Sequence, residues 1–192
     1  MSPLTIVAFV LIAFVLIASF LSFNRFVSQH QLIENAWSNI DTELRRRYDL
    51  IPNLVSTVQG YANHEREALT GVIEARAKAL ANHGSATEQA ASENVLVGGL
   101  RNLFAVSESY PDLKASTHFL DLQRQLVMTE DRIQANRRIY NGNVRSYNRR
   151  VESIPSNLIA LFGRYERAEY FEVDEALRSD DIVSVGFDVS AN

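Results

Sequence analysis

The sequence predicts an all-α protein, with an N-terminal transmembrane helix followed by an elongated antiparallel bundle of long helices. Residues 4–23 carry no charged side chain, and about 20 apolar residues are the length that a helix needs to cross a bilayer. In three later stretches apolar residues recur at spacings of three and four, the pattern of one helix face. Short segments containing glycine or proline separate these stretches and predict the turns.

The apolar run predicts a transmembrane anchor at residues 1–25, with residues 4–23 inside the bilayer. A helix is expected there because only a helix satisfies its own backbone groups in hydrocarbon. The alternative is a cleaved signal peptide, but no basic segment precedes the run, it exceeds the usual apolar length, and no A-x-A cleavage site follows. Arg25 is the first charge after the span, which favours a body that faces the cytoplasm.

The first rod is predicted to begin near Trp37 and to continue past Glu65 as far as Leu80. Pro52 interrupts its apolar face, so we expect either a kink just before Pro52 or a new helix that starts there. Gly60 weakens the same rod. The residues predicted to face inward are Trp37, Ile40, Leu44, Tyr48, Ile51, Leu54, Val55, Val58, Tyr61, Leu69, Val72, Ile73, Ala75, Ala79 and Leu80.

Two further helices follow. Residues 81–88 predict a turn, with Gly84 as a C-cap and Ser85 or Thr87 as the next N-cap. A helix over residues 88–109 is expected to face inward through Ala91, Val95, Leu96, Gly99, Leu100, Leu103 and Phe104. The segment 110–113 contains Pro111 and either reverses the chain or only kinks it. The next helix is predicted from near Ser116 to about Val151, with Phe119, Leu122, Leu126, Ile133, Tyr140, Val144, Tyr147 and Val151 inside.

Pro155 or Ser156 is predicted to start a short apolar helix over residues 158–162. Beyond Gly163 the chain turns acidic, with eight carboxylates against three arginines. Such a composition is typical of a solvated end, so residues 166–192 are predicted to be a flexible acidic tail. The helical domain is therefore expected to cover residues 26–165.

Several motifs within the predicted helices resemble those of the LemA family. They are Ile40-Asp41, Leu44, residues 46–55 (RRYDLIPNLV), Gly60-Tyr61-Ala62, His64-Glu65, Ala75-Arg76-Ala77, Glu108-x-Tyr110-Pro111-Asp112-Leu113-Lys114-Ala115, Phe119-x-x-Leu122, Thr129-Glu130-x-x-Ile133, Tyr140-Asn141, Tyr147-Asn148 and Pro155-Ser156-Asn157. The resemblance covers residues 26–172 and leaves the acidic tail outside. It implies a single-pass protein of the bacterial inner membrane, with a helical soluble domain and no settled biochemical activity.

The residue patterns argue against several chemistries. The chain has no cysteine, which excludes disulfides and thiolate sites. His64-Glu65 opens the zinc-protease motif, but Ala68 stands where the second histidine is required. None of the four histidines has a glutamate three residues before it, as a di-iron bundle needs. No catalytic residue, metal or cofactor is predicted, and the net charge of −4 gives no reason to expect nucleic acid.

Four charged residues fall on the apolar faces and predict a buried charge network. They are Glu65, Arg76, Glu130 and Arg137. A buried charge is costly unless it is paired, so we expect Glu–Arg pairs or tyrosine hydrogen bonds among them. Such pairs most simply fix the register of the helices, while the alternative is a groove for a polar ligand. Within the run Arg45-Arg46-Arg47, one side chain is expected to point inward.

A second candidate surface is basic. Residues 137–150 contain five arginines and no acid, and Arg138, Arg145 and Arg149 share one helix face. This face is a candidate for contact with anionic lipid or a partner. The leading hypothesis is a non-enzymatic membrane scaffold that holds envelope proteins or copies of itself. The alternatives are binding of anionic lipid or a small polar ligand through the arginine face and, third, an enzyme.

Overall fold

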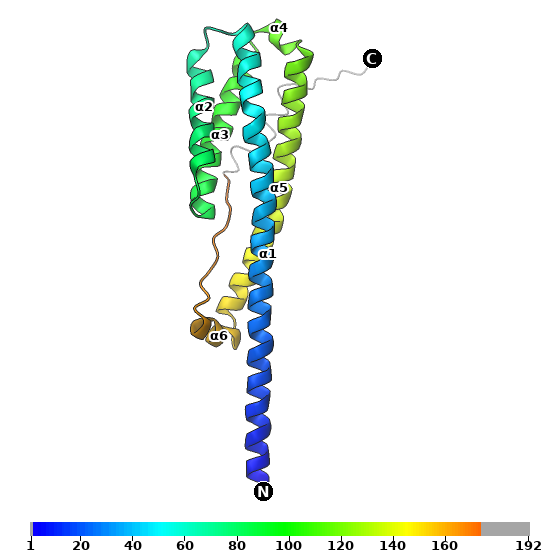
Figure 1. Ribbon diagram of the computed structural model, residues 1–192, viewed down its shortest axis with the longest axis vertical. Coiled ribbons are helices and arrows are strands. Elements are labelled where there is room, and N and C mark those ends of the chain that lie inside the picture. The colour runs from blue at the N-terminus through cyan, green and yellow to red at the C-terminus, as the bar shows by residue number, and fades with distance from the viewer. Residues whose placement is uncertain (1, 174–192) are drawn as a thin grey trace. The chain divides into compact units, whose positions relative to one another are not determined.

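The computed structural model describes residues 2–173, and these residues form helices joined by short turns (Figure 1). The helices are α1 (Pro3–Tyr61), α2 (Arg66–Ala81), α3 (Ala86–Ser107), α4 (Pro111–Lys114), α5 (Thr117–Glu152) and α6 (Ser156–Gly163). The chain divides into two compact units. Among the described residues, the first contains 2–37 and Ile139–Ala168, and the second contains Ser38–Arg138 and 169–173. The predicted all-α class is confirmed.

The first unit contains the predicted membrane span. From Leu4 to Phe23 the large apolar side chains of α1 are 47–81% exposed. Within residues 2–173, α1 is the single helix that is long and apolar enough to cross a membrane. After the span, α1 and α5 run antiparallel: Asn143 donates to the Leu32 carbonyl at 3.0 Å, and Arg150 donates to the Gln29 side chain at 2.7 Å. Phe26 fills the core between them and meets the Tyr147 ring edge-on at 6.0 Å.

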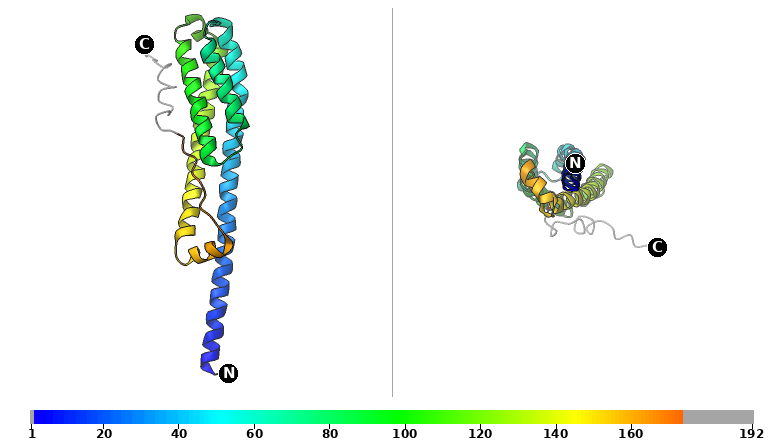
Figure 2. Two further views of the ribbon diagram at one scale, coloured as in Figure 1. Left: turned by 90° about the vertical axis from the view of Figure 1, so that its left-hand side faces the viewer. Right: turned by 90° about the horizontal axis from the view of Figure 1, so that it is seen from below.

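The second unit is an antiparallel bundle of four helical segments among the residues described. They come from α1 after Trp37, from α2, from α3 and from α5 before Ile139. Figures 1 and 2 both show α2 and α3 side by side. The two helices are close together at Gly99, where an added Cβ would lie 3.4 Å from the Val72 side chain. The core is lined by Ile40, Leu44, Ile51, Leu54, Val58, Val72, Leu96, Leu103, Leu113, Phe119, Leu122 and Ile133.

No new helix begins at Pro52, which lies inside α1. Proline has no backbone N–H, so it leaves the Tyr48 carbonyl without its partner one helical turn later. Arg76 of α2 supplies the missing donor, with its Nε 2.6 Å from the Tyr48 carbonyl oxygen. A side chain from the neighbouring helix therefore satisfies the carbonyl that the proline leaves open.

The prediction of one rod reaching Leu80 was wrong. Helix α1 ends at Tyr61, residues 62–65 form a turn, and α2 starts at Arg66. Gly60 lowers helix stability just before this turn, and Ala62 is buried within it at 1% exposure. The chain thus reverses here, which leaves Tyr61, Ile73 and Leu80 exposed at 48%, 50% and 41% rather than in the core.

The second turn follows the prediction in part. Ser85 caps α3 and forms a capping box with Glu88, as one of the two predicted caps. The C-cap of α2 is Asn82 rather than Gly84, and Asn82 also donates to the Ser92 hydroxyl at 2.7 Å. The predicted inner face of α3 is wrong at its start, because Ala91 and Val95 are exposed. Gln89, Ser92 and Glu93 are buried in their place.

At residues 110–113 the chain reverses through α4, which settles the two alternatives. The Phe104 ring of α3 meets the Phe119 ring of α5 at 6.1 Å, so the two helices pack together on either side of the turn. Helix α5 runs from Thr117 to Glu152, close to the predicted bounds. Helix α6 matches the predicted short apolar helix.

The first part of the predicted tail packs against the helices. In the first unit, the Ala168 N–H donates to the Asn148 side chain and Asn148 donates back to the Ala168 carbonyl, both at 2.9 Å. In the second unit, residues 169–173, which we call the strap, place Phe171 in the core with no exposed surface. An apolar ring within an acidic sequence explains why this part is not solvated. The remainder of the predicted tail, 174–192, lies outside the described residues.

Candidate functional site

The candidate site is a cluster of polar side chains inside the second unit, formed by Arg47, Tyr48, Gln89, Glu93 and Glu130 and called the polar centre below. Arg47 and Tyr48 come from α1, Gln89 and Glu93 from α3, and Glu130 from α5. Arg47 and Glu93 are 3% and 1% exposed. Each lies on the buried face of its helix, Arg47 between Leu44 and Ile51, and Glu93 one turn before Val97.

Arg47 bridges two carboxylates from different helices. Its Nη1 donates to Glu93 Oε2 at 2.9 Å, and its Nη2 donates to Glu130 Oε2. The Tyr48 hydroxyl donates to Glu93 Oε1, and Gln89 donates to the same oxygen at 3.1 Å. Gln89 also donates to the Tyr48 hydroxyl at 3.1 Å. Both oxygens of the buried Glu93 are therefore hydrogen-bonded, as a carboxylate in this position requires.

The polar centre is balanced in charge with the help of a second arginine. Arg137 of α5 lines the same small cavity as Arg47, Glu93 and Glu130 and donates to the Val173 carbonyl at 3.2 Å. Phe171 and Val173 of the strap close this cavity, whose volume is about 10 Å³. A space of that size holds about one water molecule. Burial and the neighbouring Glu93 carboxylate raise the pKa of Tyr48 well above its ordinary value, so its hydroxyl remains a donor.

The four residues of the predicted network have separate positions. Glu130 is part of the polar centre, and Arg137 lines its cavity. Arg76 is half-buried and donates to the Tyr48 carbonyl rather than to a carboxylate. Glu65 is half-buried in the turn before α2 and accepts a hydrogen bond from the Tyr110 hydroxyl at 3.0 Å. Glu65 is not part of a helix core because the helix breaks before it.

The predicted basic face lies on exposed positions of α5. Arg138, Arg145 and Arg149 all have exposed side chains. Arg138 belongs to the second unit, whereas Arg145 and Arg149 belong to the unit that contains the apolar span. Each unit therefore presents its own part of this basic surface.

The sequence reasoning missed Arg47, Tyr48, Gln89 and Glu93 as members of a charged site, although the signal was present. Arg47 falls three residues after Leu44 and four before Ile51, the spacing of the buried stripe. Glu93 and Gln89 continue the stripe of Leu96, Leu100 and Leu103 towards the start of α3. The inner face of α3 was assigned from Ala91 and Val95, whose apolar character pointed to the wrong side.

Among residues 2–173, no three histidine, aspartate or glutamate side chains are grouped so that they could hold a metal ion.

Comparison with known proteins places the chain in a family. The family model described as "LemA family" matches residues 36–187. The chain belongs to the LemA family. The match extends beyond the limit at residue 172 suggested by the sequence motifs, and so includes much of the acidic segment.

Named relatives of this LemA-family chain include the following three. Protein LemA of Metamycoplasma hominis is 30% identical, over 82% of this chain and 72% of its own length. Magnetosome protein MamQ 2 of Paramagnetospirillum magneticum is 28% identical, over 89% and 70%. Magnetosome protein MamQ of Magnetospirillum gryphiswaldense is 25% identical, over 78% and 64%. These names and the apolar helix fit a single-pass membrane protein, and none of the names is that of an enzyme.

Proposed function

We propose that this LemA-family protein is a non-enzymatic scaffold of the bacterial inner membrane, which holds partner proteins or copies of itself beside the bilayer. The apolar span anchors it, and the bundle of the second unit provides the contact surface. Arg25, the first charge after the span, supports a body on the cytoplasmic side. Digestion of spheroplasts with an external protease tests this sidedness, because a cytoplasmic body survives and an external one is cut.

The observation that carries this proposal is that the charged groups of the polar centre pair with one another. Arg47 joins α1 to α3 and α5, and the cavity beside it has room for about one water molecule. Buried polar groups that specify which helices pair, and in which register, are a well-attested role for such clusters. A cluster of this kind fixes how the helices pack and therefore defines the outer surface of the bundle, and the cavity beside it is too small for a substrate.

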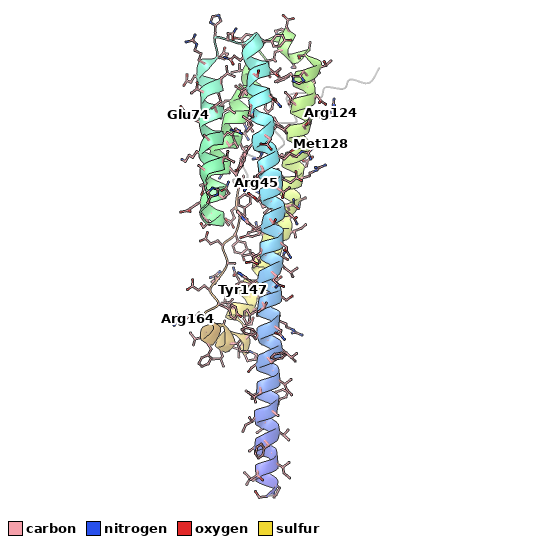
Figure 3. The ribbon with its side chains drawn as sticks, in the orientation of Figure 1. Arg45, Glu74, Arg124, Met128, Tyr147 and Arg164 are labelled. Carbon is pink, nitrogen blue, oxygen red and sulfur yellow. The ribbon has the colours of Figure 1, made fainter. Side chains whose placement is uncertain are left out.

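An exposed apolar stripe on α2 supplies a contact surface. Ile73 and Leu80 are 50% and 41% exposed, and Ala77 lies exposed between them. The spacing of four and three places them on one flank of the helix, beside the stripe of Leu69, Val72, Ala75 and Ala79 that packs inward. Polar side chains such as Glu74 lie on the outer side of α2 (Figure 3). Apolar residues in helical register are what a partner helix recognises.

Photo-crosslinking in cells tests the scaffold function. A photoreactive amino acid is placed at Ile73 or Leu80 and, as a matched control, at Lys78, which is exposed on the far side of the same helix. We expect discrete crosslinked species from the first two positions and none from Lys78. Their identification by mass spectrometry names the partner. Absence of crosslinks at Ile73 and Leu80, together with a monomer in detergent, contradicts the proposal.

The second candidate function is binding of anionic lipid or a small polar ligand through Arg138, Arg145 and Arg149. The exposure of all three arginines favours it, because a basic residue near an anionic membrane surface contributes about 1 kcal/mol of attraction. Charge reversal of the three to glutamate in the full chain, followed by titration with anionic lipid headgroups, separates the two functions. Loss of headgroup binding with unchanged crosslinks at Ile73 would assign the two surfaces to different roles.

A further inference from the structure

Helix α6 presents a large apolar surface that nothing in the first unit covers. Leu158, Leu161 and Phe162 are 56%, 74% and 88% exposed, and Ile154 just before the helix is 84% exposed. On the inward side Ala160 is buried at 3%. Single exposed apolar residues are ordinary, but a contiguous group of large ones on a soluble surface marks contact with a protein or a membrane.

The position of α6 along α1 is fixed by Tyr165. The Tyr165 ring stacks on Phe26 with centroids 4.7 Å apart and lies 6.2 Å from the ring of Phe23. The backbone N–H of Tyr165 donates to the Ala160 carbonyl at 2.9 Å, which ties Tyr165 to the end of α6. Gly163 makes room for this turn, because a Cβ there would lie 2.6 Å from the Tyr165 ring. The end of α6 is therefore held against residues 23–26 of α1.

Residues 23–26 are where the apolar span ends. At 1.5 Å per residue, residues 4–23 extend about 30 Å, the thickness of the hydrocarbon core of a bilayer. When this segment crosses the membrane, Phe23 lies at the boundary between acyl chains and headgroups. Because Tyr165 contacts Phe23 directly, the end of α6 lies at that boundary too.

The charges of the first unit suit the same location. Met1–Trp37 and Ile139–Ala168 together contain six arginines and three glutamates. Arg164 directly follows α6 and is exposed (Figure 3). Apolar side chains beside arginines are the composition of helices that lie in the plane of a membrane surface.

We propose that α6, together with Ile154, is an interfacial helix that inserts Leu158, Leu161 and Phe162 into the bilayer crossed by α1. The occupant of this apolar surface is lipid at the headgroup–acyl boundary. The first unit then contacts the membrane at two places, through the span and through α6. This contact fixes how the unit is tilted on the bilayer, and it does not depend on the proposed scaffold function.

Single-cysteine labelling tests the proposal, since the chain has no cysteine of its own. The full chain carrying Phe162→Cys or Leu158→Cys is spin-labelled and reconstituted into vesicles of phosphatidylcholine and phosphatidylglycerol. Collision rates with oxygen, which concentrates in lipid, and with a water-soluble nickel chelate report the depth of each label. Val15→Cys in the span is the lipid control, and Lys78→Cys, on the exposed far side of α2, is the water control.

We expect labels at 158 and 162 to show an oxygen-to-chelate ratio several-fold above that at 78. In a chain that also carries Leu161→Asn and Ile154→Asn, the ratio at 162 should fall towards the value at 78, with helix content unchanged. A ratio at 162 equal to that at 78 in the unsubstituted background overturns the proposal. Protection of both labels from both probes overturns it as well, because it shows that protein rather than lipid covers α6.

Discussion

Arg47→Met is the most informative perturbation of the polar centre. The side chains of Arg47 and Glu93 are 4% and 1% exposed, and that of Glu130 is 17% exposed. Removal of the guanidinium leaves one fully buried and one largely buried carboxylate without their cation. Breaking a buried pair in this way costs about 3–5 kcal/mol of unfolding free energy. For a chain of this size the loss lowers the melting temperature by roughly 6–20 °C.

Thermal melts of the full chain in detergent, followed by circular dichroism, measure this change. Arg45→Met is the matched control, since Arg45 is exposed two residues earlier on the same helix and forms its ion pair with Asp41, at 2.8 Å, on the surface. The control should melt like the parent. A triple variant, Arg47→Met with Glu93→Leu and Glu130→Leu, should recover most of the lost stability, because apolar residues of similar volume can replace a buried charge cluster. A parent-like melt for Arg47→Met, or a triple variant less stable than the single one, would refute the reasoning.

Three further predictions concern the second unit. Arg76→Ala leaves the Tyr48 carbonyl unsatisfied and should cost about 1–3 kcal/mol of unfolding free energy, measured by urea titration. In the Pro52→Ala background the cost should be smaller, because alanine restores the backbone N–H. Equal costs in both backgrounds would exclude this coupling. Tyr48 has a raised pKa, so its contribution to stability is complete below the ordinary value of 10.0 and declines as the pH rises through it. The parent should lose up to about 1.4 kcal/mol per pH unit above that value, and Tyr48→Phe should show a shallower alkaline loss in the same titrations; identical slopes would contradict the assignment. Phe171→Ala removes a fully buried ring and should cost about 3–5 kcal/mol, with faster hydrogen exchange across the strap, whereas the exposed Glu172→Ala serves as control and should leave exchange unchanged.

Much of the fold was predictable because its signals are local. The uncharged run at residues 4–23 and the three-and-four spacing of Phe119, Leu122 and Leu126 depend only on neighbours along one helix. Breaks were harder. Pro52 is a strong local signal for a break, yet α1 continues through it because Arg76 from another helix satisfies the open carbonyl. Conversely, the turn at residues 62–65 has only Gly60 as a local signal, and the apolar spacing continues across it.

The sequence predicted a cluster of buried charged residues, but it named only some of the residues that form the polar centre. Charges on apolar stripes drew attention to Glu130 and Arg137, and both residues line the cavity. Glu65 was placed on the apolar face of a rod that was assumed to be unbroken, and the turn before α2 interrupts that face. Glu93 was missed because its face was assigned from Val95, which is 52% exposed. The partners that allow Glu93 to be buried, Arg47 and Tyr48, come from α1, and no spacing within α3 contains that information.

The position of Phe171 has a consequence for the order in which the protein is made. The ribosome releases the anchor first and this ring more than a hundred residues after Arg47, yet the ring is part of the wall around that arginine. Until the ring emerges, the ion pairs at the centre of the bundle face water on one side. The interior is therefore completed only after residue 171 has been made, and a nascent chain that stalls before this point would reach the membrane with its charged interior still hydrated.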